Sequence, residues 1–222
     1  RIKDIARLVT KMLVIFPFEE EFYKKFGVNA EYVGHPLTSV AVCGFTKDEA
    51  KAELGLNGAN PVVALLPGSR TEEIRRLLPL MLEGVSLFEK RLGRRLTVIL
   101  PAADGIDDGL LKEFLSKSGV DVLVFRKKTY TVMRAADIAV VSSGTATLET
   151  ALIGTPMIIV YKVSRLSYLI GRRLIGIDRI GLPNIVSGFM VAPELIQDCV
   201  TPENIEKEMS GIFENPERLK FM

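Results

Sequence analysis

Two short turns in this sequence combine glycine, hydroxyl and charged residues in patterns that can hold a phosphate. In the first, Gly68, Ser69 and Arg70 follow an apolar run and precede an amphipathic stretch. Gly68 allows the backbone to come close to a ligand, and the Arg70 guanidinium could pair with a phosphate. Ser69 and Glu72 have capping-box spacing, which predicts a helix start. An ordinary strand-to-helix turn with a solvated arginine is the alternative, and Glu72 and Glu73 argue against a general anion site.

The second turn reads Ser142, Ser143, Gly144 and Thr145, between an apolar run and a short helical pattern. Its hydroxyls and the unpaired backbone N–H groups of a helix N-terminus would form a phosphate cradle. Glu149 follows one helical turn later, where an acidic side chain can accept hydrogen bonds from ribose hydroxyls, as in dinucleotide sites. A helix capped by serine or threonine, with a surface glutamate, would have the same sequence. The pattern leaves a nucleotide site and a plain capped helix both open.

Composition and missing motifs exclude several classes of function. Neither turn is G-x-G-x-x-G or a P-loop, so a nicotinamide, flavin or P-loop nucleotide site is not supported. His35 is the only histidine, which rules out a Ser-His-Asp triad and a multi-histidine metal centre within this chain. Cys43 and Cys199 form no C-x-x-C pair, so we predict no metal site and reduced thiols. The net charge of +2 gives no case for nucleic-acid binding.

A third stretch mixes basic and apolar residues. Arg165, Arg172, Arg173 and Arg179 interleave with leucine, isoleucine and tyrosine, a pattern typical of a segment on an anionic membrane surface. Core packing with a cationic edge explains it nearly as well. Asn184 follows in a Gly-Leu-Pro-Asn turn, where its amide could contact a ligand or cap the turn. No apolar run reaches the ~20 residues that a membrane-spanning helix needs.

The elements that must position these residues alternate along the chain. Continuous apolar runs, typical of strands buried on both faces, predict strands over 12–16, 30–33, 62–66, 96–100, 120–125, 138–141 and 157–161. Amphipathic stretches predict helices over 19–26, 72–92, 109–118, 131–135, 145–153, 167–175 and 202–213. This alternation predicts an α/β fold with a doubly wound parallel sheet. Ligands bind such sheets beyond the carboxyl ends of the strands, where both turns lie.

A change of composition predicts a domain boundary. Residues 43–60 are rich in glycine, asparagine and charge, and we interpret them as a linker. Residues 1–42 would then be the C-terminal remnant of a preceding Rossmann-like domain, and 61–200 a complete one. Residues 201–222 would form a C-terminal helix that is cut short. The chain begins with Arg1, inside a helical pattern, so we interpret it as a fragment.

Taken in order, several blocks of the sequence resemble one enzyme family. They are LLPGSRTEEI, SSGTATLETALIGTPMIIVYK and GLPNIVSG, with FPFEEEFYKKFGVNAEYVGHPL before them and PELIQDCVTPENI after them. Together they look like lipid-A-disaccharide synthase, a family of glycosyltransferases with the GT-B fold. Each block is weak alone, but the set at this spacing is specific, and it spans essentially the whole chain.

The resemblance implies two Rossmann-like domains that face a cleft. The C-terminal domain would bind the UDP of UDP-2,3-diacylglucosamine, and the N-terminal domain would help to form the acceptor site for 2,3-diacylglucosamine 1-phosphate, lipid X. The 6-hydroxyl of the acceptor would attack the anomeric carbon of the donor, with inversion and without a metal or other cofactor. The products would be lipid A disaccharide 1-phosphate and UDP, in lipopolysaccharide biosynthesis.

Carried onto this sequence, the resemblance assigns roles to the residues of the turns. Glu149 would bind the ribose hydroxyls, and Arg70 would stabilise the negative charge that develops on leaving UDP. Asn184 would line the donor site. The other predicted substrate-binding residues belong to the two turns and are Gly68, Ser69, Ser143, Gly144, Thr145 and Ala146.

The resemblance also implies a cellular setting and a limit. Both substrates are lipids, so it implies a cytoplasmic enzyme, peripheral on the inner face of the cytoplasmic membrane, and it allows a homodimer. The proposed base of the family, an aspartate, belongs to the N-terminal domain that this chain mostly lacks. We therefore expect the chain alone to bind nucleotide and not to catalyse transfer. Two other interpretations stay open: an isomerase like UDP-N-acetylglucosamine 2-epimerase, and a non-catalytic UDP-sugar-binding module.

Overall fold

The chain folds as two compact units, Arg1–Val42 and Cys43–Met222. The computed structural model describes all of the chain except residues 1, 57, 59 and 165–178. Each unit has its own sheet. That the smaller unit is the end of a preceding domain stays a prediction.

The smaller unit contains a two-stranded parallel sheet. Strand β1 (Met12–Val14) pairs with β2 (Ala30–Tyr32), and both are shorter than the runs predicted from sequence. Helix α2 (Pro17–Lys24) connects them, as parallel neighbours require a crossover. Two further helices, α1 (Ile2–Leu8) and α3 (Leu37–Val40), come before and after this β-α-β unit in sequence.

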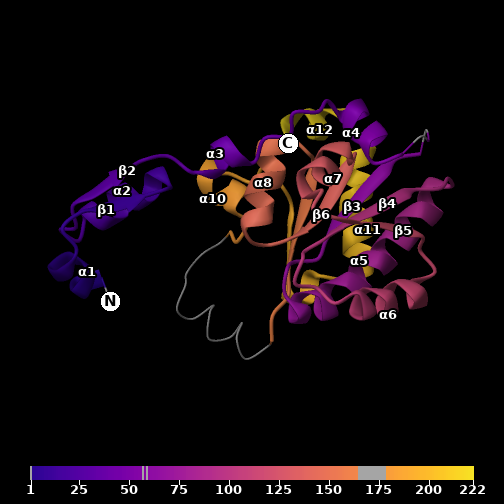
Figure 1. The fold of residues 1–222 in the computed structure, drawn as a ribbon, viewed down its shortest axis with the longest axis horizontal. Coiled ribbons are helices and arrows are strands. Elements are labelled where there is room, and N and C mark those ends of the chain that lie inside the picture. Colours follow the sequence, from indigo (N-terminus) through magenta and orange to yellow (C-terminus); the bar gives the residue numbers. More distant parts are fainter. Residues whose placement is uncertain (1, 57, 59, 165–178) are drawn as a thin grey trace. The chain divides into compact units, whose positions relative to one another are not determined.

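The larger unit is built on one six-stranded sheet (Figure 1). Its strands in chain order are β3 (Val62–Leu66), β4 (Thr97–Ala102), β5 (Val122–Arg126), β6 (Ile138–Ser142), β7 (Met157–Tyr161) and β8 (Glu194–Ile196). Their spatial order is β5-β4-β3-β6-β7-β8, and every neighbouring pair is parallel. The chain winds outward from β3 in one direction and from β6 in the other. The doubly wound, Rossmann-like arrangement predicted from sequence is confirmed.

Helices cover both faces of this sheet (Figure 1). The helices of one face share a buried apolar cluster and are α5 (Thr71–Leu92), α6 (Asp108–Ser118) and α11 (Pro202–Phe213). The helices of the other face share a second cluster and are α4 (Lys47–Glu53), α7 (Thr129–Ala135) and α8 (Thr145–Ile153). The remaining short elements are α10 (Leu182–Ser187), the 3-10 helix η1 (Gln197–Cys199) and α12 (Pro216–Phe221).

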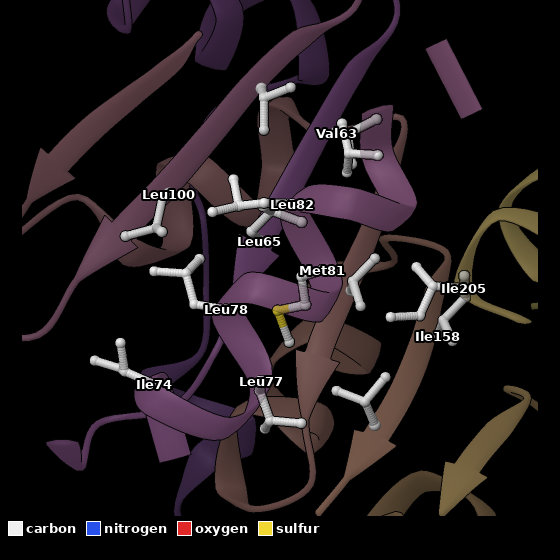
Figure 2. Close-up of a cluster of buried hydrophobic side chains, with 14 of the residues drawn as sticks. Val63, Leu65, Ile74, Leu77, Leu78, Met81, Leu82, Leu100, Ile158 and Ile205 are labelled. Carbon is white, nitrogen blue, oxygen red and sulfur yellow. The ribbon is translucent and has the colours of Figure 1, made fainter. Parts of the chain in front are cut away.

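Strand β3 supplies both apolar clusters, because successive side chains of a strand point to opposite faces. Val63 and Leu65 belong to the cluster under α5, which Figure 2 shows beside the apolar side chains of that helix. Val62, Ala64 and Leu66 belong to the cluster under α7. All five residues of the strand are buried. This double burial explains the continuous apolar run in the sequence.

Residues 43–60 and 201–222, which the predicted division of the chain lists separately from 61–200, pack onto the larger unit. Residues 43–60, predicted to be a linker, contain α4, which packs against α7 and buries Ala50 completely. In residues 201–222, helix α11 packs along α5, and a Cβ on Gly84 would stand 2.8 Å from Ile205. Sequence analysis missed β8, α10 and α12, which have three to six residues and are too short to show a period.

Candidate functional site

An open pocket lies where the two central strands of the sheet end. It has a volume of about 350 Å³, and two of its walls are the turns after β3 and β6. In a doubly wound sheet this position is the switch point, where the crossover connections leave in opposite directions and make room for a ligand. The pocket brings together every predicted substrate-contacting residue except Asn184: Gly68, Ser69, Arg70, Ser143, Gly144, Thr145, Ala146 and Glu149.

A carboxylate holds the turn after β3. Gly68 has a φ of 110°, a conformation that glycine adopts far more readily than other residues. The Glu73 carboxylate accepts the Ser69 N–H at Oε2 over 3.2 Å and Arg70 Nη1 at Oε1 over 2.6 Å. A Cβ on Gly68 would stand 2.2 Å from Glu73 Oε2. Glycine at this position therefore leaves the space that the carboxylate fills.

The predicted capping box of Ser69 and Glu72 is wrong. Helix α5 begins at Thr71, with Arg70 at its N-cap and no side-chain capping bond. Glu72 instead pairs with Arg76 one turn further on, with 3.1 Å between Oε2 and Nη2. Glu73 is the acid that reaches back to the turn, because the helix starts one residue later than the capping box requires.

Arg70 stands free enough to meet a ligand. Its side chain is 80% exposed, whereas that of its partner Glu73 is 27% exposed. An ion pair this exposed contributes little to stability, so exchanging the carboxylate for a phosphate oxygen costs little. Of the Arg70 donors, Nη1 alone is used within the part of the chain that the structure describes.

The turn after β6 presents backbone donors to the pocket. Helix α8 begins at Thr145, its N-cap is Gly144, and no side chain caps it. The N–H and the hydroxyl of Thr147 both donate to the Gly144 carbonyl, at 3.1 and 2.7 Å. The N–H groups of Gly144, Thr145 and Ala146 have no acceptor among the described residues. They leave the positive end of the helix dipole open to an anion.

The Ser143 hydroxyl was predicted to help bind a phosphate, but in the structure it donates to a backbone carbonyl. Its Oγ donates to the Ile180 carbonyl at 3.0 Å, and its N–H donates to the Val160 carbonyl at 2.8 Å. Both of its donors are thus used inside the protein, and the oxygen can only accept from a ligand. The bond to Ile180 ties the rim of the pocket to the chain that leads into α10.

Glu149 lines the pocket from α8 and is half-buried. Its Oε1 accepts a hydrogen bond of 2.9 Å from the hydroxyl of Tyr130 on α7. Burial, together with this carboxylate, raises the pKa of Tyr130, so the phenol stays protonated and remains a donor. Oε2 of Glu149 has no partner among the residues described, so it is available to a ligand hydroxyl.

The charged side chains that line the pocket are Arg70, Glu73 and Glu149. One guanidinium faces two carboxylates, so side-chain charge alone does not favour an anion. Any attraction for a phosphate would have to come mainly from the open N–H groups of α8. The described residues contain no cluster of three or more histidine, cysteine or acidic side chains that could hold a metal ion.

Asn184 does not line the pocket, and the structure gives it an internal role. It is fully buried, and its Oδ1 accepts the N–H groups of Val191 at 2.7 Å and Ala192 at 3.0 Å. Its Nδ2 donates to Glu194 at 2.7 Å and to the Ala192 carbonyl at 2.8 Å. Glu194 in turn accepts the N–H groups of Ile180 and Gly181. The amide is committed to holding this loop, so its placement does not support the predicted donor contact.

Other predicted features fall outside the pocket or outside the described residues. His35 accepts the Leu37 N–H at Nδ1 over 3.1 Å and packs against Phe16, as expected of a structural histidine. Cys43 and Cys199 are both free. The basic stretch lies mostly in residues 165–178, which the structure does not describe. In the remainder of the chain no helix is long and apolar enough to cross a membrane.

Sequence analysis missed the third wall of the pocket. Pro101 lies near the end of β4, Ala103 directly follows that strand, and Thr129 is the first residue of α7. The residues at the carboxyl end of β4 could have been expected to line the pocket, because β4 neighbours β3 in parallel and both strands end at the same edge of the sheet. The predicted strand stopped at Leu100, before the residues that matter. Tyr130 could not be predicted, because its hydrogen bond to Glu149 forms only in the folded chain and leaves no pattern in the sequence.

The whole chain matches a known protein family. A family model described as "Lipid-A-disaccharide synthetase" covers residues 1–221. The lipid-A-disaccharide synthase of Syntrophus aciditrophicus is 48% identical over 221 residues, which are 99% of this chain and 57% of that protein. That of Geobacter metallireducens is 46% identical, over 97% of this chain and 56% of its own length. The chain therefore spans little more than half the length of these curated relatives.

Solved structures show the same fold at low identity. A glycosyltransferase from Rickettsia africae aligns with a TM-score of 0.61 and 9% identity, over 99% of this chain and 59% of that one. Anabaena Alr3699/HepE, solved with UDP and glucose, gives 0.57 and 13%, over 96% and 56%. A putative UDP-N-acetylglucosamine 2-epimerase from Listeria monocytogenes gives 0.62 and 14%, over 93% and 52%. These likenesses establish the GT-B type of fold, which transferases and an epimerase share.

Proposed function

Because this chain belongs to the lipid-A-disaccharide synthetase family, we propose that it forms the donor-binding part of a glycosyltransferase of lipid A biosynthesis. The donor in this proposal is UDP-2,3-diacylglucosamine and the acceptor is lipid X. One observation carries the proposal: both phosphate-competent turns and Glu149 meet in a single pocket at the switch point of the sheet. Neither turn alone distinguishes a nucleotide site from an ordinary capped helix.

A nucleoside diphosphate matches the pocket part by part. The open N–H groups at the start of α8 would bind the diphosphate. The Glu149 carboxylate would accept hydrogen bonds from the ribose hydroxyls through its free Oε2 and the second lone pair of Oε1. The volume of about 350 Å³ lies within the range of small-molecule sites. Gly68 and Ser69 would contact the ligand through their backbone.

In the proposed reaction the acceptor oxygen attacks the anomeric carbon from the face opposite UDP, which inverts that centre. The bond between the anomeric carbon and the phosphate oxygen breaks, and its electron pair stays on UDP. Arg70 and the α8 N–H groups would stabilise this developing charge, the role that a metal ion plays in other transferases. We therefore propose a metal-independent transfer, with the base that accepts the hydroxyl proton supplied from outside the described residues.

An isomerase is the competing assignment, since the Listeria epimerase has a similar fold. Family membership favours the transferase, because the curated relatives of high identity are named as synthases. The two assignments differ in their dependence on acyl chains. A transferase of lipid substrates needs diacylated donor and acceptor, whereas an epimerase would act on soluble UDP-N-acetylglucosamine.

Calorimetric titration of the chain with UDP, and with NAD as the control ligand, tests the nucleotide site. We expect saturable UDP binding and no response to NAD. The Glu149→Ala variant should bind UDP about 10- to 100-fold more weakly, because hydrogen bonds to a charged group contribute about 1.5–3 kcal/mol. Glu83→Ala, an exposed glutamate of α5 outside the pocket, is the matched control and should bind like the wild type. UDP affinity unchanged in a correctly folded Glu149→Ala variant would exclude the ribose role.

The transferase assignment needs a protein of full family length. A chimaera can supply it, with this chain replacing the matching 57% of the Syntrophus aciditrophicus relative. We expect disaccharide and UDP to form from the two diacylated substrates presented in vesicles, in keeping with a proposed site of action at the inner face of the cytoplasmic membrane. Epimerisation of UDP-N-acetylglucosamine, with no product from the acylated pair, would favour the isomerase.

A further inference from the structure

The side chain of Tyr130 links the buried core to the pocket. Its ring packs against the apolar cluster under α7, and its hydroxyl donates to Glu149 Oε1 at 2.9 Å. Tyr130 follows Thr129, which lines the pocket, but it is not itself among the described lining residues. It therefore stands behind Glu149, with its phenol fixed by packing and its hydrogen bond directed at the carboxylate.

This contact restricts how Glu149 can meet a ligand. An ionised carboxylate has about four lone-pair positions, and the phenol occupies one of them on Oε1. The others, on Oε1 and Oε2, are left for a ligand on the pocket side. A glutamate on the surface of a helix would otherwise sample several rotamers, and ordering one such side chain opposes binding.

We propose that Tyr130 is a positioning residue that holds the Glu149 carboxylate in the orientation that recognises a vicinal diol. The proposal rests on the proposed function, in which that diol belongs to the ribose of a uridine diphosphate. Tyr130 touches no part of the ligand in this arrangement. It acts through Glu149, and its effect is confined to ligands that carry ribose hydroxyls.

The test compares UDP with 2′,3′-dideoxy-UDP, which lacks both hydroxyls. The measured quantity is the ratio of the two dissociation constants, obtained by calorimetry for each variant. Wild-type protein should prefer UDP by at least 10-fold, and Glu149→Gln should lose most of this preference. Tyr130→Phe keeps the packed ring and removes the donor, so it should reduce the preference about 2- to 10-fold, the range expected for ordering one side chain.

The ratio separates positioning from a general structural role. If Tyr130 served only the fold, its replacement would weaken both ligands by the same factor and leave the ratio unchanged. Tyr161→Phe is the matched control, since Tyr161 is a half-buried tyrosine at the end of β7 that does not line the pocket. It should leave both constants and their ratio unchanged.

Each outcome bears on a different claim. A wild-type ratio that survives in Tyr130→Phe overturns the positioning role and leaves the proposed nucleotide site intact. Equal wild-type affinity for the two ligands overturns the ribose role of Glu149, and the positioning role with it. Absence of UDP binding by the wild type removes the proposed function and everything that rests on it.

Discussion

Replacing Asp137 by asparagine should destabilise the larger unit by about 2 kcal/mol and leave UDP binding unchanged. Asp137 precedes β6, at the end of the sheet opposite the pocket. Its Oδ2 accepts the Val62 N–H at 2.7 Å, and its own N–H donates to the Val62 carbonyl at 2.8 Å. Lys47 pairs with Oδ1 at 2.6 Å, and Lys51 approaches Oδ2 at 3.4 Å. One carboxylate therefore fastens β6, β3 and α4 together.

The magnitude follows from the parts of this contact. A hydrogen bond to a charged group contributes about 1.5–3 kcal/mol and a neutral one about 1 kcal/mol. Asparagine keeps an acceptor for the Val62 N–H, so exchanging the charged bond for a neutral one lowers the free energy of unfolding by about 1 kcal/mol. Lys47 is 42% exposed, so its ion pair adds at most about 1 kcal/mol. Alanine removes the acceptor as well. Because Val62 is only 2% exposed, its unsatisfied N–H should cost a further 1–3 kcal/mol or so.

The ionisation of Asp137 determines how the loss of stability in Asp137→Asn depends on pH. Burial alone would raise the pKa of Asp137, but the hydrogen bonds from Lys47 and the Val62 N–H, with the charges of Lys47 and Lys51, outweigh burial and lower it. Because the pKa of Asp137 is lower in the folded state than in the unfolded state, its ionised carboxylate stabilises the fold above the unfolded pKa of about 3.9. This stabilisation is lost as pH falls through the folded pKa. The difference between wild type and Asp137→Asn should therefore be constant from about pH 7 to pH 5 and shrink below about pH 4.

Urea unfolding followed by far-UV circular dichroism measures these differences. Asp121→Asn is the matched control, because Asp121 is exposed and should change the free energy of unfolding by less than about 0.5 kcal/mol. The reasoning is refuted if Asp137→Asn is no less stable than this control at pH 7. It is also refuted if the loss is the same at pH 3 as at pH 7, since a contact that depends on ionisation cannot behave so.

Two glycine substitutions probe close approaches in the same unit. Gly84→Val should lower the free energy of unfolding by about 2 kcal/mol, because a Cβ there would stand 2.8 Å from Ile205 and 3.2 Å from the Pro202 carbonyl. Unchanged urea unfolding would contradict the tight packing of α5 on α11. Gly68→Ala should weaken UDP binding at least 10-fold in calorimetry, because its Cβ would displace the Glu73 carboxylate from the turn. Wild-type affinity in that variant would show that the turn does not need Glu73.

The sheet of the larger unit could be predicted because its strands are buried on both faces. The runs 62–66 and 157–161 match β3 and β7 residue for residue, since every position in them faces a helix or the core. Helix α8 was equally clear, with apolar and small residues between two glycines. By contrast, β8 has three residues and only one of them is buried, so nothing in its sequence marks a strand. Its pairing with β7 is a property of the folded sheet.

The site could be predicted as far as it is local in sequence. The turns at Gly68 and Gly144 each carry their own signal, and the sheet topology brings them together. What sequence could not give is the use of each polar atom. Whether Asn184 faces a ligand or the protein depends on residues 180–194 folding around it, and the same holds for the Ser143 hydroxyl. A polar residue in a motif is therefore a candidate, and its partners in space decide its role.

The charges of the pocket bear on which ligand it selects. A phosphate about 6 Å from a carboxylate is repelled by about 3 kcal/mol per unit charge at an effective dielectric constant of about 20. Arg70, Glu73 and Glu149 together give the lining of the pocket one net negative charge, which opposes the binding of a free phosphate at the α8 N–H groups. In the proposed function a nucleotide would change this balance, because its ribose hydroxyls would use Glu149 as an acceptor while its phosphates lay against the helix. In the proposed function the Glu149 carboxylate thus contributes to specificity. It repels anionic ligands that lack a diol and accepts hydrogen bonds from those that carry one.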